Sequence, residues 1–187
     1  SLTTLSATVL TNLCAGLFIL PFFLFSATAG QLADKYEKSK IVRLVKWSEV
    51  AIMIIASYGF ATDHFSLLMV AIFLMGVHST FFGPIKYSVI PQLIPADKLV
   101  AGNAYVETGT FIAILIGTIA AGVAASLADA VFYIVVGLMG ISLLGLLTSY
   151  FLQPVVVGDA NLKIQKNPFP EILKNIKYFR PQTALFN

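Results

Sequence analysis

The chain has 187 residues, of which 58% are hydrophobic and only 11% are charged, and its mean hydropathy is +0.87. Because roughly a quarter of the residues of a soluble domain are charged, this composition excludes an ordinary soluble domain and predicts a protein embedded in lipid. The distribution of basic residues along the chain accounts for the formal net charge of +3, so we expect no nucleic acid as a partner. The single Cys14 excludes an internal disulfide.

Five apolar runs fill most of the chain, and each is about as long as a helix needs to cross a bilayer. The predicted spans are residues 9–29, 45–62, 66–85, 103–125 and 130–151. The expected fold class is therefore an all-α transmembrane bundle of five helices over residues 1–152. Residues 153–187 are expected to form a cytoplasmic linker and an amphipathic arm, because apolar residues recur there at helical spacing.

The positive charge of the chain lies on one side of these spans. All 12 basic residues follow the first, third or fifth span. Since cytoplasmic connections retain Lys and Arg, we expect the N-terminus outside and the C-terminus in the cytoplasm. The chain lacks an initial Met and a basic leader, so we expect a piece of a larger protein rather than a signal peptide.

The connection between the third and fourth spans contains two prolines. Pro91 and Pro95 are expected to break any continuous helix there, and residues 96–99 can start the next one. The connections after the second and fourth spans are very short, which predicts two antiparallel helical hairpins.

The fourth span carries small residues at a spacing of four, which places them on one face of a helix: Gly109, Ala113, Gly117, Ala121 and Ala125. Such a stripe lets another helix approach closely, so it predicts tight helix packing. A static membrane anchor could use the same packing, and the stripe by itself does not distinguish a moving bundle from an anchor.

Three ionisable residues lie within predicted spans, where a charge is costly and indicates a functional site or a partner. Glu107 lies about one turn inside the fourth span and His78 past the middle of the third. His78 could instead be hydrogen-bonded to a neighbouring helix. Glu49 is expected to have a structural role, paired with Lys46 or Arg43. No residue pattern predicts a catalytic site, a metal site or a cofactor.

Residues 30–40, GQLADKYEKSK, resemble the loop between the second and third helices of major facilitator superfamily transporters. The matching positions are Gly30, Leu32, Ala33, Asp34, Lys35 and Lys38. Glu37 stands where that family has glycine and Ser39 where it has a basic residue, so the turn is expected to be built differently. The resemblance implies a partial N-terminal half of that fold, helices 2 to 6, whose partners are the first helix and the C-terminal half.

Residues 81–122 resemble the bacterial lysophospholipid transporters, which occur alone or fused to acyltransferase and acyl-carrier-protein synthetase domains. The matching positions are Gly83, Pro84, Lys86, Tyr87, Leu99, Asn103, Glu107 and Gly117. The third span lacks an arginine and the fourth lacks a Gly-Pro pair, which makes a drug/proton antiporter less favoured. The implied function is secondary transport of lysophospholipid across the bacterial inner membrane. The alternatives are another small-molecule cargo and the membrane portion of a fused acyltransferase.

This resemblance implies two sets of site residues. A conformational clasp would comprise Gly30, Asp34, Lys35, Lys38 and Lys86. Asp34 needs a cationic partner or the positive N-terminus of a neighbouring helix, because it lies at the unfavourable C-terminal end of its own helix, and Lys86 is the candidate cation. Without the family resemblance, a solvated turn would be the preferred interpretation. The substrate site would comprise Glu107, His78 and Asn103.

Overall fold

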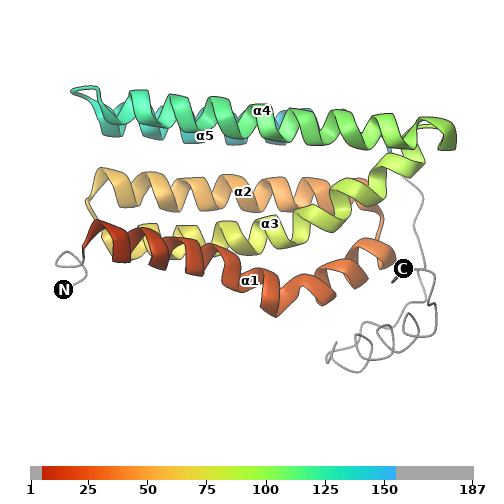
Figure 1. Ribbon diagram of the computed structural model, residues 1–187, viewed down its shortest axis with the longest axis horizontal. Helices are drawn as coiled ribbons and strands as arrows, with labels where there is room; N and C mark the ends of the chain where they lie inside the picture. Colours follow the sequence, from red (N-terminus) through yellow and green to blue (C-terminus); the bar gives the residue numbers. More distant parts are fainter. Residues whose placement is uncertain (1–5, 155–187) are drawn as a thin grey trace, which may run out of the picture.

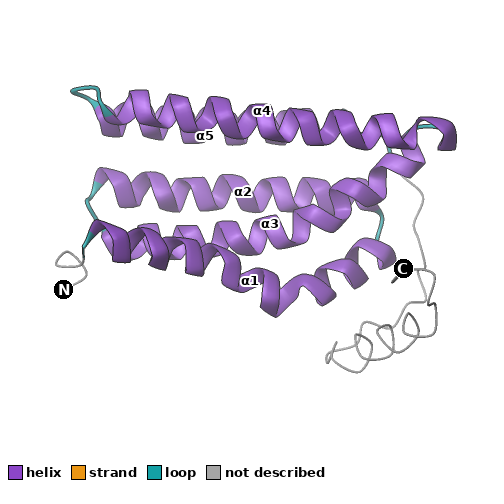
Figure 2. Cartoon of the chain, in the orientation of Figure 1, coloured by secondary structure: helices purple, strands orange, loops and turns teal. Residues whose placement is uncertain are grey.

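The computed structural model describes residues 6–154, which form helices joined by short connections (Figures 1 and 2). The helices are α1 (Ala7–Lys35), α2 (Lys38–Ala61), α3 (Phe65–Leu93), α4 (Leu99–Ala125) and α5 (Ala130–Ser149), with a 3-10 turn, η2 (Ala96–Lys98), before α4. Each predicted span falls largely or wholly within one of these helices, which confirms the all-α class. Apart from residues 153 and 154, the predicted linker and arm lie outside the described residues.

Four stretches of the described residues are long and apolar enough to cross a membrane. They are α1, α3, η2 with α4 (Ala96–Ala125), and α5. The first half of α2 carries four basic residues and Glu49, so it is the least apolar of the five long helices. It nevertheless runs alongside the others over a similar length (Figure 1).

The helices pack in layers around α2 and α3. Helix α1 packs along α3, α2 lies between α3 and α5, and α4 has sparser contacts with α5 and α3. The connections α1–α2 and α3–α4 lie at the same end of the bundle (Figure 1). The end of α5 joins them there, since Arg43 near the start of α2 donates a hydrogen bond to the carbonyl of Leu152 at 3.2 Å. The two connections expected in the cytoplasm, and the end of the fifth span, are thus neighbours in space.

Two of the long helices contain prolines and change direction. Pro21 lies inside α1, where it is buried, and the ribbon of α1 bends visibly (Figure 1). A proline removes a helical hydrogen bond and its ring crowds the preceding turn, which accounts for a bend without ending the helix. At this level Gly76 of α3 faces α1: a Cβ atom at Gly76 would lie 3.0 Å from the Pro21 ring and would also meet the Phe18 carbonyl. The close crossing of α1 and α3 therefore requires glycine.

The second half of α3 diverges from α1 and crosses toward α4 (Figure 1). Both Pro84 and Pro91 lie inside this helix, which continues to Leu93. The prediction that Pro91 breaks the helix was therefore wrong. The break comes at Pro95, which precedes η2, and residues 96–99 do start the next helical segment, as predicted.

The small-residue stripe of α4 is not at a helix contact. All of its members are exposed in the described structure, and a Cβ atom at Gly109 or Gly117 would meet no atom within 4 Å. Indeed α4 has no buried residue at all. The predicted close packing on this face is absent from the described part of the chain, because α4 turns other residues toward α3 and α5.

Candidate functional site

A charged cluster joins α3 to α4 at the end of the bundle where those helices meet. The Lys86 ammonium of α3 lies 3.3 Å from Glu107 Oε1 of α4 and also donates to the Thr110 hydroxyl oxygen at 3.3 Å. The Tyr87 hydroxyl donates a hydrogen bond to the same Glu107 oxygen. Two neighbouring residues of α3 thus hold one carboxylate of α4.

The helix geometry explains why these residues meet. The course of α3 beyond Pro84 carries Lys86 and Tyr87 toward the first turns of α4 (Figure 1). Glu107 and Thr110 are three residues apart on α4, so they share a face. The Lys86 ammonium also lies 4.7 Å from the centre of the Tyr87 ring, a distance at which an aromatic face attracts a cation.

This cluster is open to its surroundings. The side chain of Lys86 is 23% exposed and that of Glu107 is 41% exposed. A cation and a carboxylate therefore lie side by side where a ligand carrying both charges could reach them. Asn103, one turn before Glu107 on the same face of α4, is exposed and makes no side-chain hydrogen bond within the described residues.

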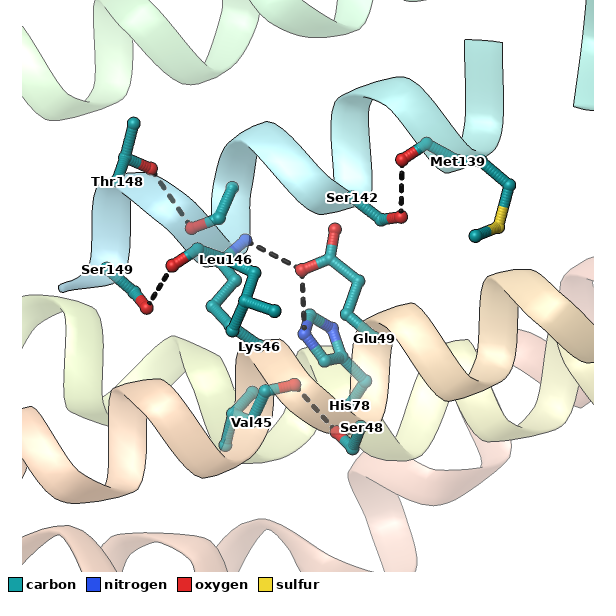
Figure 3. A network of polar contacts seen from close by, with 11 residues as sticks. Val45, Lys46, Ser48, Glu49, His78, Met139, Ser142, Leu146, Thr148 and Ser149 are labelled. Carbon is teal, nitrogen blue, oxygen red and sulfur yellow. Dashed lines mark hydrogen bonds and ion pairs between the residues drawn. The ribbon is translucent and has the colours of Figure 1, made fainter. Parts of the chain in front are cut away.

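A second charged cluster lies between α2, α3 and α5 (Figure 3). Lys46 donates to Glu49 Oε2 at 2.7 Å, which confirms the predicted pairing on α2. The His78 Nε2 atom of α3 lies 3.3 Å from the same oxygen, although this contact does not have the geometry of a hydrogen bond. The His78 side chain is 7% exposed. Among the described residues, no hydrogen bond or ion pair joins His78 to the Glu107 cluster: His78 lies against Glu49 of α2, whereas Glu107 pairs with Lys86.

Aromatic and small residues shape the space around this second cluster. The ring of His78 stacks on Phe82 with 5.9 Å between ring centroids, and the Lys46 ammonium lies 4.9 Å from the Phe82 ring centre. On α5, a Cβ atom at Gly145 would lie 3.3 Å from the Lys46 ammonium. Gly145 thus leaves room for the lysine between α2 and α5.

The turn between α1 and α2 consists of only two residues, Tyr36 and Glu37. Glu37 is the N-cap of α2: its carboxylate accepts hydrogen bonds from the backbone N–H groups of Ser39 at 2.9 Å and Lys40 at 3.2 Å. A carboxylate at this position satisfies backbone donors that the helix leaves unpaired. The turn is therefore built by a cap where the superfamily pattern has a glycine, as the sequence led us to expect.

Four of the five predicted clasp residues lie on either side of this turn in the sequence, and all five are helical. Gly30, Asp34 and Lys35 belong to the last turns of α1, and Lys38 begins α2. Lys38 is only 4% exposed, whereas Asp34 is exposed. Lys86, the expected partner of Asp34, pairs instead with Glu107, and the described residues contain no ion pair of Asp34.

Sequence reasoning missed a connection between the start of α2 and the end of α5. Besides the Arg43 to Leu152 hydrogen bond, the Arg43 guanidinium lies 5.3 Å from the centre of the Tyr150 ring. The Trp47 indole donates to the Tyr150 hydroxyl at 3.2 Å. The signal available in the sequence was Trp47 and Tyr150 at the ends of apolar spans, where aromatic side chains gather at membrane interfaces.

Apolar helices that hold charged pairs between them define a multi-pass membrane protein. Residues 3–186 match the family described as Major Facilitator Superfamily. The chain belongs to this superfamily of membrane transporters, and the all-helical bundle is a partial form of its fold.

Several curated relatives are named lysophospholipid transporter LplT. The protein of Escherichia fergusonii is 32% identical over 110 residues, which cover 59% of this chain and 26% of the relative. Those of Enterobacter sp. (strain 638) and Citrobacter koseri are 31% and 32% identical over 108 residues, with 58% of this chain and 26% of each relative covered. The match thus spans about a quarter of the length of these relatives. No solved structure gives a significant match.

Proposed function

We propose that this chain is part of a transporter that moves lysophospholipids across the bacterial inner membrane by alternating access. The similarity to proteins named lysophospholipid transporter supports the cargo. In this proposal the remaining helices of the superfamily fold come from the rest of the transporter, and the two halves rock around a central site. The basic ends of the first, third and fifth spans face the cytoplasm.

The observation that carries the proposal is the exposed ion pair of Lys86 and Glu107. A lysophospholipid such as lysophosphatidylethanolamine has a negative phosphate and a positive ammonium a few bonds apart. Glu107 would take the ammonium and Lys86 the phosphate, so that the ligand replaces one ion pair by two. Since moving an uncompensated charge into lipid is costly, this exchange keeps every charge paired while the headgroup crosses the bilayer.

The other predicted site residues have subordinate roles in this proposal. Asn103, on the same face of α4 as Glu107, would add a hydrogen bond to the headgroup. His78 would act through the packing of α2, α3 and α5, because its ring is buried beside Glu49. The clasp of Asp34 and the nearby lysines would close in another conformation, in which Lys86 or a different cation approaches Asp34.

The test is uptake of labelled lysophosphatidylethanolamine by spheroplasts of a strain that lacks its own uptake. It uses the full-length natural protein that contains this chain, as wild type, Glu107→Gln and Asp97→Asn. Asp97 is an exposed carboxylate in η2 near the same end of α4 and serves as the matched control. We expect wild type and Asp97→Asn to take up the lipid and Glu107→Gln to lose at least tenfold in rate at equal membrane levels, which corresponds to about 1.4 kcal/mol. Absence of uptake by correctly inserted wild type would exclude this cargo.

A further inference from the structure

A groove of about 930 Å³ runs along α2 and α3, and the end of α1 with the α1–α2 turn lines one end of it. Its volume is at the upper end of the roughly 300–1,000 Å³ typical of ligand sites. The groove exists because α1 and α2 each pack on α3 and make little contact with one another beyond their connecting turn. It is separate from the Lys86 and Glu107 site, which lies between α3 and α4.

The walls and the floor of this groove are apolar over most of its length. Leu44, Ala51 and Ile55 of α2 face Leu74 and Phe81 of α3 across it. The lining of α2 extends from Lys40 to Ile55, which is 16 residues and about 22 Å at a rise of 1.5 Å per residue step. Since the hydrocarbon core of a bilayer is roughly 30 Å thick, one leaflet contributes about half of that. The groove is therefore long enough for one extended acyl chain from a single leaflet.

One end of the groove is positively charged. Lys35 of α1 and Lys40 of α2 line it there, together with Tyr36. Among the described residues that line the groove, Glu37 is the only carboxylate, and it already accepts the backbone N–H groups of Ser39 and Lys40, so its charge is directed toward the start of α2. A ligand headgroup at this end would meet two ammonium groups. This differs from the Lys86 and Glu107 site, where both signs of charge are present.

We propose that this groove binds an anionic diacyl phospholipid of the cytoplasmic leaflet, such as phosphatidylglycerol. One acyl chain would lie along α2 and α3, the second would remain in the bilayer, and the phosphate would lie between Lys35 and Lys40 at the end that α1 and the α1–α2 turn line. Basic pockets between transmembrane helices on the cytoplasmic side attract anionic headgroups, and lysines can extend their ammonium groups to the headgroup level while their stems stay in the apolar region. The proposal rests on the membrane orientation proposed above and is independent of the transported cargo.

The experiment is photolabelling of the full-length natural protein in phosphatidylethanolamine vesicles. The vesicles contain a trace of phosphatidylglycerol or phosphatidylcholine with a photoreactive group in the middle of one acyl chain, and labelled peptides are identified by mass spectrometry. We expect phosphatidylglycerol to label residues 51–55 and 74–77 about tenfold more than phosphatidylcholine, the order of magnitude for two lysines near a headgroup. The preference should fall at high salt, which screens the attraction.

Three variants test the assignment of the charges and the apolar wall. Lys35→Gln with Lys40→Gln should reduce phosphatidylglycerol labelling to the phosphatidylcholine level, whereas Lys98→Gln, an exposed lysine of η2 outside the groove, should leave it unchanged. Ala51→Trp fills the groove and should block labelling by both lipids. Equal labelling of the wild type by the two lipids, or labelling that avoids residues 51–55 and 74–77, overturns the proposal. The comparison of the two lipids uses only the wild-type protein, so it tests the proposal even if a variant misfolds. None of the labelling results depends on uptake of lysophospholipid.

Discussion

Lys86 of α3 and Glu107 of α4 are 21 positions apart in the sequence, yet 3.3 Å separates the lysine nitrogen from a carboxylate oxygen. The pair connects two helices that otherwise have few contacts with one another. In the described part of the chain, this ion pair and the hydrogen bonds of Tyr87 to Glu107 and of Lys86 to Thr110 are the polar side-chain contacts between α3 and α4. The same pair is the proposed headgroup site, so its contribution to stability and its contribution to transport need separate measurements.

Replacing only one member of this pair should be worse for stability than replacing both. Lys86→Gln leaves the Glu107 carboxylate without its cation, whereas Lys86→Gln with Glu107→Gln leaves two neutral groups that can still hydrogen-bond. Since both side chains are partly exposed and exposed ion pairs contribute little, we expect only a small decrease in stability for the single variant. The apparent melting temperature in detergent checks this. If the melting temperature of the double variant falls by the sum of the decreases in the two single variants, the residues do not interact.

The crossing of α1 and α3 should tolerate no side chain at Gly76. Gly76→Leu would push into the Pro21 ring and the Phe18 carbonyl, so it should separate the helices and greatly reduce the yield of folded protein. Gly83 provides a matched control on the same helix, since a Cβ atom there would meet nothing within 4 Å. We expect Gly83→Ala to fold like the wild type. Monodisperse protein recovered by size-exclusion chromatography is the measurement, and equal recovery of Gly76→Leu would contradict the crossing.

The cap of α2 predicts an unusual order of stability for variants at Glu37. Glu37→Ala removes the acceptor for the Ser39 and Lys40 backbone N–H groups, and losing a cap costs about 0.5–2 kcal/mol. Glu37→Gly, which restores the residue of the superfamily pattern, should cost less, because glycine is only a few tenths of a kcal/mol worse than a good cap. Thermal unfolding of the three proteins gives the order. A Glu37→Gly variant less stable than Glu37→Ala would show that the cap is not what stabilises this turn.

The Lys46, Glu49 and His78 cluster should govern packing rather than transport. Gly145→Leu places a branched side chain where the Lys46 ammonium lies, so it should displace the lysine from Glu49 and destabilise the bundle by roughly 1–3 kcal/mol. Gly137→Leu, on the same helix but facing open space, is the control. We expect Gly145→Leu to lower the melting temperature and Gly137→Leu to leave it unchanged. Per folded molecule, uptake should remain within about twofold, and a selective loss of uptake would place this cluster in the transport site.

The sequence alone determined the class of the protein and the approximate positions of its helices. A strongly apolar chain with five runs of membrane length has few ways to satisfy its backbone in lipid, and helices are the local solution. The Lys46 and Glu49 contact was also predictable, because residues three apart on a helix are neighbours. An altered turn was also expected, because Glu37 stands where the superfamily pattern has glycine, but the structure alone showed that Glu37 caps α2.

Only the tertiary structure decided which charges of different helices meet. The α3 bend that brings Lys86 to Glu107 depends on how a helix accommodates Pro84 and Pro91, and the expectation that Pro91 ends the helix failed for that reason. Likewise, the spacing of the small residues on α4 identified the stripe, but its exposure depends on how α4 is rotated against α3 and α5. Helical periodicity fixes which residues share a face, whereas the partner of that face is fixed by packing between residues distant in the chain. The groove along α2 and α3 belongs to the same category, because it is the space left where α1 and α2 both pack on α3.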